Sequence, residues 1–414
     1  MSTVVLVGTI DTKGREVRFV RDCLLAAGVT PLVIDIGVTE SRHDVGRVDI
    51  PASEVARAGG ADLASLRNKG EQDNSRARAL QIMANGLSRI LPNLREAGRL
   101  DAVLGFGGSS GSSVIAAAFQ ALAIGVPKLL VSTMAAGDVS PYVGTRDVTL
   151  MYSVVDIAGL NAISSVVLRN AAHAAAGMAR GAAIPSTVEG DSESLIGITM
   201  FGVTTTAVTA IQAALEAEGL GTTVFHATGA GGQAMEHLVR DGLLAGVVDL
   251  TTSELTDEIV GGVLSAGPDR MEAAGSIGLP QILVPGALEI VNFGAEATVP
   301  APFRVPERRL HVHNAAVTIV RTTAEESSAI GRIFAEKANK STGPTVVMLP
   351  LRGLSAIDAP GQPYEDVEAD QALFHAIRST LRDDIKLVEV DAAINDVDFT
   401  DAVIREFLSI WRSR

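Results

Sequence analysis

Short apolar runs alternate with amphipathic stretches along this chain. An apolar run at 2–8 is followed by a helical period over 15–27 and by a second apolar run at 30–36. Short runs that are rich in β-branched residues and lack polar alternation are typical of buried parallel strands, and a helix between two of them makes a βαβ unit. The pattern therefore predicts that the chain opens as a doubly wound α/β fold does.

The same order of elements begins again in the second half. Residues 195–202 form an apolar run, 204–218 have a helical period, and 222–226 form another short run. This repeated order favours an internal duplication of two similar α/β domains.

A polar stretch separates the two halves. Residues 181–194 combine glycine, proline, serine and acidic residues without an apolar period, which indicates a linker. We predict an α/β protein of two Rossmann-like domains, each a mostly parallel sheet flanked by helices. The domains are expected at 1–185 and 195–414, joined by a linker at 186–194.

Composition supports this fold and limits the partners. Hydrophobic residues make up 47% of the 414 residues and aromatic residues only 4%, so the core is built mainly from Ala, Val, Leu and Ile. A formal charge of −14 and a pI near 5.0 argue against nucleic acid or an anionic membrane surface as a partner. The single Cys23 excludes an internal disulfide, and the N-terminus has no basic leader segment. We expect a cytoplasmic protein that binds no membrane.

The clearest site signal is a glycine- and serine-rich turn at 105–113. It follows the apolar run at 102–104 and leads into an alanine-rich helical stretch. Glycine lets the backbone approach a ligand, and the free N–H groups and positive dipole end of the helix favour a phosphate or carboxylate. The alternative is a tight turn between two buried elements. The candidate ligand-binding residues are Gly107, Gly108, Ser109, Ser110 and Gly111.

A second candidate lies in the loop after the first apolar run. Asp11 stands among the hydroxyl groups of Thr9 and Thr12 and close to Lys13. Hydroxyl groups and lysine suit phosphate oxygens, and the carboxylate suits Mg²⁺. The alternative is a capped helix start with a solvated Asp and Lys. We expect the two loops to share one ligand, with Asp11 as the metal ligand.

The loops of the second half carry more ionisable groups. A turn at 228–233 repeats the glycine-rich pattern, and the loop at 251–258 offers hydroxyl groups and three carboxylates, including Glu254. Arg321 and Arg352 follow apolar runs, where a guanidinium can hold a carboxylate or phosphate bidentately. For Arg352 the alternative is a surface ion pair with an acid.

Two histidines form a further candidate. His311 and His313 alternate in the sequence, so on a strand they point to the same side. Such a pair suits a metal, but no CxxC or HExxH motif accompanies it. The alternative, if the pair faces a cleft, is that these histidines act as a general base or as hydrogen-bond partners of a substrate.

Two common nucleotide-binding motifs are missing. No GxxxxGK[ST] occurs, so the chain is not a P-loop NTPase. Glycines in 105–111 loosely match a dinucleotide fingerprint, but the next apolar run ends in 132–134 without the acid that would hold a ribose. A nicotinamide-dependent dehydrogenase is thereby disfavoured.

Five motifs occur in order along nearly the whole chain. They are Gly8-Thr9-Ile10-Asp11-Thr12-Lys13-Gly14, Gly105-Phe106-Gly107-Gly108-Ser109-Ser110-Gly111, Asp249-Leu250-Thr251-Thr252-Ser253-Glu254-Leu255, His313-Asn314 with Arg321-Thr322-Thr323-Ala324-Glu325, and Pro350-Leu351-Arg352-Gly353. Together they resemble the Tm-one-like ATP-binding domain family, which is named for the inhibitory N-terminal domain of a tomato protein that gives resistance to tomato mosaic virus. The resemblance implies two Rossmann-like subdomains, ATP with Mg²⁺ as the ligand, and a homodimer or higher homo-oligomer. In the plant protein this domain is fused to a TIM barrel, so the resemblance also implies a TIM-barrel protein as a partner.

Three functional hypotheses remain open. The first is an ATP- and Mg-binding protein whose phosphates are held by the glycine-serine turn, with small-metabolite chemistry between the domains as an added function. The second is a metabolic enzyme, a hydrolase, lyase or transferase, that acts on a small phosphorylated or carboxylate substrate without using ATP. In it, Arg321 and Arg352 would hold the anion, and Glu254, His311 or His313 would move protons. The third is an interaction module whose nucleotide is structural.

Overall fold

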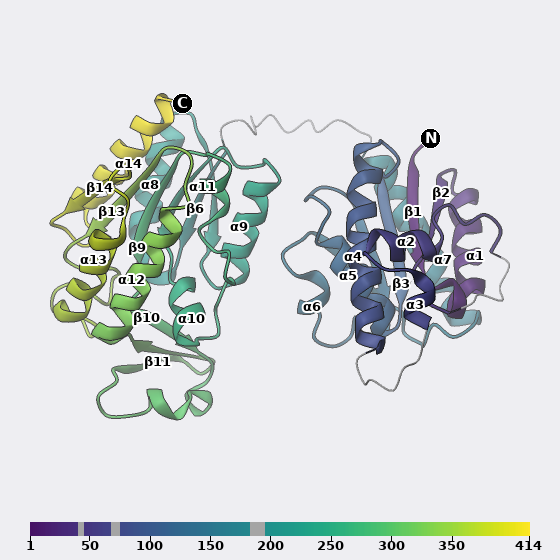
Figure 1. The fold of residues 1–414 in the computed structure, drawn as a ribbon, viewed down its shortest axis with the longest axis horizontal. Helices are drawn as coiled ribbons and strands as arrows, with labels where there is room; N and C mark the ends of the chain where they lie inside the picture. Colours follow the sequence, from purple (N-terminus) through teal and green to yellow (C-terminus); the bar gives the residue numbers. More distant parts are fainter. Residues whose placement is uncertain (40–44, 68–74, 183–194) are drawn as a thin grey trace. The chain divides into compact units, whose positions relative to one another are not determined.

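The structure is a computed structural model that describes residues 1–39, 45–67, 75–182 and 195–414. It divides into two units, Met1–Val188 (unit 1) and Glu189–Arg414 (unit 2) (Figure 1). The linker predicted at 186–194 lies outside the described residues. None of the described helices is long and apolar enough to cross a membrane.

Unit 1 is built on a five-stranded parallel sheet with the strand order β2-β1-β3-β4-β5. The strands are β1 Thr3–Gly8, β2 Thr30–Asp35, β3 Ala102–Gly107, β4 Lys128–Ser132 and β5 Val148–Tyr152. The helices are α1 Ile10–Ala26, α2 Ala52–Ala58, α3 Leu63–Arg67, α4 Ser75–Glu96, α5 Ser109–Phe119, α6 Ser140–Val143 and α7 Ala162–Gly181. Strands β3 and β4 are buried at every residue, as expected for inner strands of a sheet that is covered on both faces.

Alternate side chains of the sheet of unit 1 belong to two cores. Val5 and Val7 of β1 lie in a core with residues of α2, α4 and α5, whereas Val4 and Leu6 lie in a core with residues of α1 and α7. This alternation is the period of two that a strand imposes on its side chains. The apolar runs in the sequence therefore correspond to strands that are buried on both sides.

Helix α1 begins at Ile10, five residues earlier than the sequence pattern indicated. The backbone amides of Thr12 and Lys13 donate to the carbonyl of Thr9, which closes the first helical turn. Lys13 itself departs from helical geometry, with φ −129° and ψ 28°, so the helix is kinked there. Residues 11–13 thus belong to a helical turn that fixes their directions, not to a free loop.

Unit 2 is built on a six-stranded parallel sheet with the strand order β14-β13-β9-β8-β6-β7. The strands are β6 Leu195–Met200, β7 Gly221–His226, β8 Gly246–Thr251, β9 Gln281–Gly286, β13 Thr345–Pro350 and β14 Lys386–Val390. The α-helices are α8 Thr205–Ala217, α9 Ala230–Arg240, α10 Glu254–Val260, α11 Ala273–Ser276, α12 Ala324–Ala338, α13 Val367–Thr380 and α14 Val397–Arg412, and the 3-10 helices are η2 Gly202–Thr204, η3 Glu296–Thr298 and η4 Ala301–Phe303. Helices α8 and α14 share a core with one face of the sheet, and α12 and α13 share a core with the other face.

The two parallel sheets have the same strand order at their centres. In each, the second strand lies beside the first, and the third strand lies on the first strand's other side. In a doubly wound sheet, ligands bind outside the carboxyl ends of the strands where this order reverses, which here is between β1 and β3 in unit 1 and between β6 and β8 in unit 2. The predicted fold class of two Rossmann-like domains is confirmed, and the shared order agrees with an internal duplication.

A small antiparallel sheet in unit 2 was not predicted. It has the order β10-β12-β11, formed by β10 Ile290–Phe293, β11 Leu310–Asn314 and β12 Val317–Arg321. Figure 1 shows β11 and the chain before it projecting from one end of unit 2. Strand β10 has only four residues, which is too short to show a period by itself.

Candidate functional site

A pocket of about 760 Å³ lies at the carboxyl ends of β1, β2 and β3, the switch point of unit 1. Most of the residues predicted to bind a cofactor line it: Thr9, Asp11, Thr12, Lys13, Gly108, Ser109, Ser110 and Gly111. Gly107 does not line the pocket, because it is the last residue of β3 beneath the turn. The structure thus brings the two predicted loops together at one opening.

The glycine-serine turn joins β3 to α5. Gly108 is the N-cap residue of α5, and no side chain caps this helix start. Two of the four serines bond within the turn or to the neighbouring strand. The hydroxyl of Ser112 contacts the carbonyl of Gly107 and the hydroxyl of Ser132, and the hydroxyl of Ser113 donates to the carbonyl of Ser109. Ser109 and Ser110 are left at the pocket, together with the first backbone N–H groups of α5.

Gly107 and Gly108 have different roles in this turn. A Cβ atom at Gly107 would lie 3.1 Å from the Cα atom of Gly111 and from the backbone nitrogen of Ser112, so a side chain there would push α5 away from the strand. A Cβ atom at Gly108 would meet only the hydroxyl of Thr133, at 3.9 Å. Gly107 is therefore needed for packing, whereas Gly108 keeps space open at the pocket.

The turn also matches the G-x-S-x-G sequence pattern of serine hydrolases, with Ser109 at the centre. In that motif the nucleophile sits on a strained turn between strand and helix. Ser109 is the first residue of α5, and it is absent from the described non-glycine residues with positive φ, which are Val154, Met271 and Ala287. Its geometry fits a helix start that receives an anion better than a nucleophile.

The first turn of α1 supplies the other side of the pocket. The hydroxyl of Thr12 donates to that of Thr9 at 3.0 Å. One carboxylate oxygen of Asp11, Oδ2, accepts hydrogen bonds from the backbone N–H and the hydroxyl of Thr39, at 3.0 and 2.7 Å. The other oxygen, Oδ1, is buried and accepts no hydrogen bond from the described residues. A held carboxylate with one unused oxygen fits a metal ligand.

Three cationic side chains reach this pocket. Lys13 was predicted, but its ammonium group donates to the backbone carbonyl of Ile157. Arg67 and Arg76 also line the pocket, and sequence reasoning missed both. Among the lining residues that the structure describes, Asp11 is the one carboxylate, so these residues together carry an excess of positive charge in a chain of net charge −14.

The apolar part of the pocket was also missed. Ile36 and Val38 come from the chain after β2, Leu66 from α3, and Leu80 from α4. The sequence signal was weak, because 37–72 shows mainly polar residues without a clear period. An apolar wall beside a few polar groups is the usual composition of a small-molecule site.

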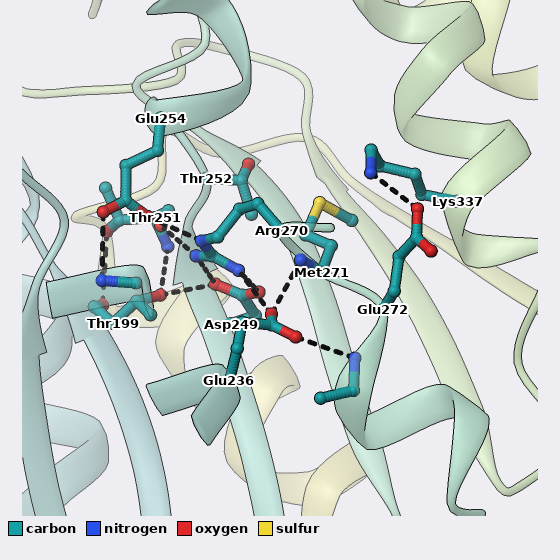
Figure 2. A network of polar contacts seen from close by, with 12 residues as sticks. Thr199, Glu236, Asp249, Thr251, Thr252, Glu254, Arg270, Met271, Glu272 and Lys337 are labelled. Carbon is teal, nitrogen blue, oxygen red and sulfur yellow. Dashed lines mark hydrogen bonds and ion pairs between the residues drawn. The ribbon is translucent and has the colours of Figure 1, made fainter. Parts of the chain in front are cut away.

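The switch point of unit 2 contains a buried ion cluster around Arg270, which Figure 2 shows. The fully buried guanidinium of Arg270 bonds to Glu254 at 2.6 Å and to both oxygens of Asp249 at 2.5 and 2.7 Å. Glu236 lies 3.5 Å from the same guanidinium and accepts the backbone N–H groups of Met271 and Ala273. Burial raises the pKa of Glu236, while Arg270 opposes that rise.

Glu254 also occupies the glycine-rich turn of unit 2. Its Oε1 atom accepts the backbone N–H groups of Gly229 and Gly232, at 2.7 and 3.0 Å, at the start of α9. This carboxylate therefore takes the position that a bound anion would take at a helix N-terminus. Glu254 was predicted to move protons, and the structure places it as a fully buried partner of Arg270 and of this turn.

Arg321 lies in a second buried cluster, at the end of β12. Its guanidinium bonds to Asp370 at 2.5 Å, to Asp358 at 3.2 Å and to the backbone carbonyl of Tyr364 at 2.9 Å. Burial raises the pKa of Glu289 to about 7, against the effects of Arg321 and the Ser355 hydroxyl. By geometry, neither carboxylate oxygen of Glu289 accepts a hydrogen bond from the described residues.

Two further carboxyl groups of the same cluster, Asp358 and Asp370, also have raised pKa values. Burial, followed by the charges of Glu289 and Asp370, raises the pKa of Asp358 to about 9. Burial raises the pKa of Asp370 as well. In α10, burial raises the pKa of Asp257 to about 7, although it accepts two hydrogen bonds from Asn292. Several buried carboxyl groups of unit 2 therefore have pKa values above their ordinary range.

We expect unit 2 to lose stability as the pH rises from about 5.5 to about 8.5. A carboxyl group whose pKa is higher in the folded chain binds more protons when folded, so the free energy of unfolding falls between its unfolded pKa, about 4, and its folded pKa. Each group contributes at most about 1.4 kcal/mol per pH unit. Urea unfolding followed by the fluorescence of Trp411, the single tryptophan, which lies in α14, reports this for unit 2 alone.

Glu289→Gln is the matched variant for this measurement, because it keeps the shape and removes one titrating group. We expect its stability to depend less steeply on pH than that of the wild type. The pKa values of Glu272 and Asp391 are lowered, and such shifts act in the opposite direction, but only near and below pH of about 4.5. Stability that rises with pH, or an unchanged slope in Glu289→Gln, would contradict the assignment.

The remaining predicted residues lie at the surface. His311 and His313 are exposed on β11, and the described residues hold no group of three or more His, Cys, Asp or Glu side chains arranged for a metal. Arg352 pairs with Asp391 at 2.6 and 2.9 Å, and both side chains are more than half exposed. The surface ion pair, one of the two interpretations of Arg352, is the arrangement observed.

The fold and the pocket define a two-domain α/β protein with a parallel sheet in each domain and a pocket at the switch point of the first. The chain belongs to the uncharacterised protein family UPF0261. Residues 2–183 match the model of the N-terminal domain of this family, and residues 193–411 match the model of its C-terminal domain.

Relatives extend over the whole chain. A UPF0261 protein of Clostridium tetani is 44% identical over 98% of both chains, and one of Rhizobium meliloti is 42% identical over 99% of both. The ToMV resistance protein Tm-1(GCR237) of Solanum lycopersicum is 37% identical over 98% of this chain, which spans 55% of the tomato protein. The resemblance to the tomato protein that the five motifs indicated is thus confirmed.

Similarity to solved structures is weak. UDP-GlcNAc 2-epimerase from Neisseria meningitidis, bound to UDP-GlcNAc, aligns over 92% of this chain and 100% of its own with 11% identity and a TM-score of 0.21. At this level the match carries no argument about function.

Proposed function

We propose that unit 1 binds ATP with Mg²⁺ in the pocket at the ends of β1, β2 and β3. The observation that carries this proposal is the excess of positive groups among the described residues that line the pocket. Lys13, Arg67 and Arg76 line the pocket beside the helix start of α5, which no side chain caps. In a chain of net charge −14, such a local excess favours an anionic ligand.

The phosphates would lie on the glycine-serine turn. The first N–H groups of α5 and the hydroxyl groups of Ser109 and Ser110 can donate to phosphate oxygens, and the helix dipole adds a favourable field. Thr9 and Thr12 offer further hydroxyl groups from α1. The apolar wall formed by residues such as Ile36 and Leu80 suits the flat face of the adenine ring.

Asp11 fits the role of the metal ligand. Thr39 holds one of its carboxylate oxygens, and the other is buried without a partner among the described residues. Mg²⁺ in nucleotide sites is commonly held by one or two carboxylates together with phosphate oxygens and water. A single carboxylate beside a phosphate turn therefore suits Mg²⁺ better than a metal that needs an all-protein ligand set.

Calorimetric titration with ATP tests the proposal. We expect the wild type to bind ATP, and to bind it more tightly with Mg²⁺ than with EDTA, because Asp11 would help to hold the metal and the metal would offset phosphate charge. Asp11→Asn should abolish most of this gain from Mg²⁺, a weakening of about tenfold, since it removes a charge-assisted contact. Asp22→Asn is the matched control, because Asp22 is an exposed acid on the same helix outside the pocket.

The outcomes separate the parts of the proposal. Absence of heat and of any thermal shift in the wild type at millimolar ATP would overturn it. Equal affinity for ATP in Mg²⁺ and in EDTA would support nucleotide binding and would contradict the role of Mg²⁺.

A further inference from the structure

Arg76 is a cation placed among positive groups. It is the second residue of α4, whose first turn contains no acidic side chain. Its guanidinium nitrogen Nη2 donates to the hydroxyl of Ser110, the second residue of α5, at 3.0 Å. Arg76 therefore lies at the positive dipole ends of two helices at once.

This placement is unfavourable without an anion. A helix N-terminus carries roughly half a positive charge, so a guanidinium beside it is repelled and a negative group is attracted. No acidic side chain pairs with Arg76 in the part of the chain that the structure describes. Arg76 is an exposed side chain that lines the pocket, so a ligand from solution can reach it.

The other two cations of the pocket are differently engaged. The ammonium group of Lys13 donates to the carbonyl of Ile157. The guanidinium of Arg67 donates to the carbonyls of Val38 and Thr39, and so holds the chain that follows β2. Of the three, Arg76 is the one bonded to a residue of the glycine-serine turn.

We propose that Arg76, and not Lys13, is the cation that binds the phosphate seated on the glycine-serine turn. The inference rests on the proposed function for the identity of the ligand, but the anion site itself stands on the charges described above. When a phosphate binds, the guanidinium exchanges its neutral bond to Ser110 for charge-assisted bonds to phosphate oxygens. Its planar fork suits two such bonds at once. Lys13 is then a positioning residue that ties the first turn of α1 to the chain before α7.

The test compares two ligands, ATP with Mg²⁺ and inorganic tripolyphosphate, by calorimetric titration at low and high salt. We expect Arg76→Gln to weaken the binding of both ligands by about tenfold or more, and to weaken their dependence on salt, because one charge is lost. Arg76→Lys should fall between Arg76→Gln and the wild type, since it keeps the charge and loses the fork. Lys13→Gln should have a smaller effect than Arg76→Gln.

Arg78→Gln is the matched control, because Arg78 is an exposed arginine of the same helix outside the pocket. It should bind both ligands within about twofold of the wild type, since exposed charges at a distance are screened. Circular dichroism melting of each variant checks that unit 1 stays folded.

The outcomes distinguish the assignment of Arg76 from the proposal of ATP binding. If Arg76→Gln binds like the wild type, or if Lys13→Gln loses more affinity, the assignment of Arg76 is overturned while ATP binding stands. If the wild type binds tripolyphosphate through Arg76 but does not bind ATP, the assignment of Arg76 stands and the nucleotide proposal is overturned. If the wild type binds neither ligand, both are overturned.

Discussion

We expect Gly108→Val, in the turn between β3 and α5, to abolish most ATP binding and to leave unit 1 folded. The backbone at Gly108 has φ −79° and ψ −167°, an extended conformation that valine adopts readily. A Cβ atom there would meet only Thr133 Oγ1, at 3.9 Å, so the fold has room for it. The methyl groups would fill space at the pocket and keep phosphate oxygens away from the N–H groups of α5. We expect a loss of at least about 100-fold, equal to about 2.7 kcal/mol.

Calorimetric titration with ATP and Mg²⁺ measures this effect, and Gly177→Val is its matched control. Gly177 lies in α7 of the same unit and is exposed, and a Cβ atom there would meet nothing within 4 Å outside its own helix backbone. The control should bind ATP like the wild type. Retained affinity in Gly108→Val with an unchanged melting temperature would mean that the phosphates do not lie on this turn.

Arg270→Met should cost unit 2 a large part of its stability. The variant leaves Asp249, Glu254 and Glu236 buried without their shared cation. Removal of one partner from a buried ion pair typically costs about 3–5 kcal/mol, and a domain has only about 5–15 kcal/mol in total. Urea unfolding followed by the fluorescence of Trp411 measures the loss in unit 2.

Two comparisons give this experiment its meaning. Arg352→Met removes an exposed ion pair with Asp391, and it should cost no more than about 1 kcal/mol. Arg270→Met combined with Glu254→Gln should recover part of the loss, because one unpaired charge is removed while a carbonyl oxygen still faces the turn at α9. Equal losses in Arg270→Met and Arg352→Met would show that the buried cluster does not hold unit 2 together.

The sequence allowed the prediction of one half of the pocket. The loop at 9–13 and the turn at 105–113 each follow an apolar run, and carboxyl ends of parallel strands meet at one edge of a sheet. Their meeting in unit 1 therefore follows from the fold class. The boundary of α1 was less accurate, because the kink at Lys13 interrupts the helical period.

The other half of the pocket depends on packing between elements that are distant in the sequence. Arg76 reaches Ser110 because α4 and α5 contribute side chains to the same core, although the two residues are 34 positions apart. A helical period at 75–97 predicts the helix but does not show which helix it packs against. One sequence without a set of relatives gives no pairing information of that kind.

The ion cluster of unit 2 was hidden for the same reason. The turn at 228–233 and Glu254 were each recognised as candidate sites. In the structure they bind each other, because two N–H groups of the turn donate to the Glu254 carboxylate. A glycine-rich turn looks the same in a sequence whether its N–H groups meet a ligand or a carboxylate of the same chain. The distinction appears only in the tertiary contacts of Arg270.

The Glu254 carboxylate makes the glycine-rich turns of the two units differ in whether the chain itself supplies their hydrogen-bond acceptor. In unit 2 the acceptor at the start of α9 is a side chain of the same polypeptide. Each molecule therefore carries one such acceptor, and it cannot diffuse away. If unit 1 binds an anion at the start of α5, as we propose, that acceptor comes from solution, and the occupancy of the turn would follow the concentration of the ligand. Under this proposal, a chain with two similar sheets combines one unit whose acceptor is built in with one whose state depends on the supply of a small molecule.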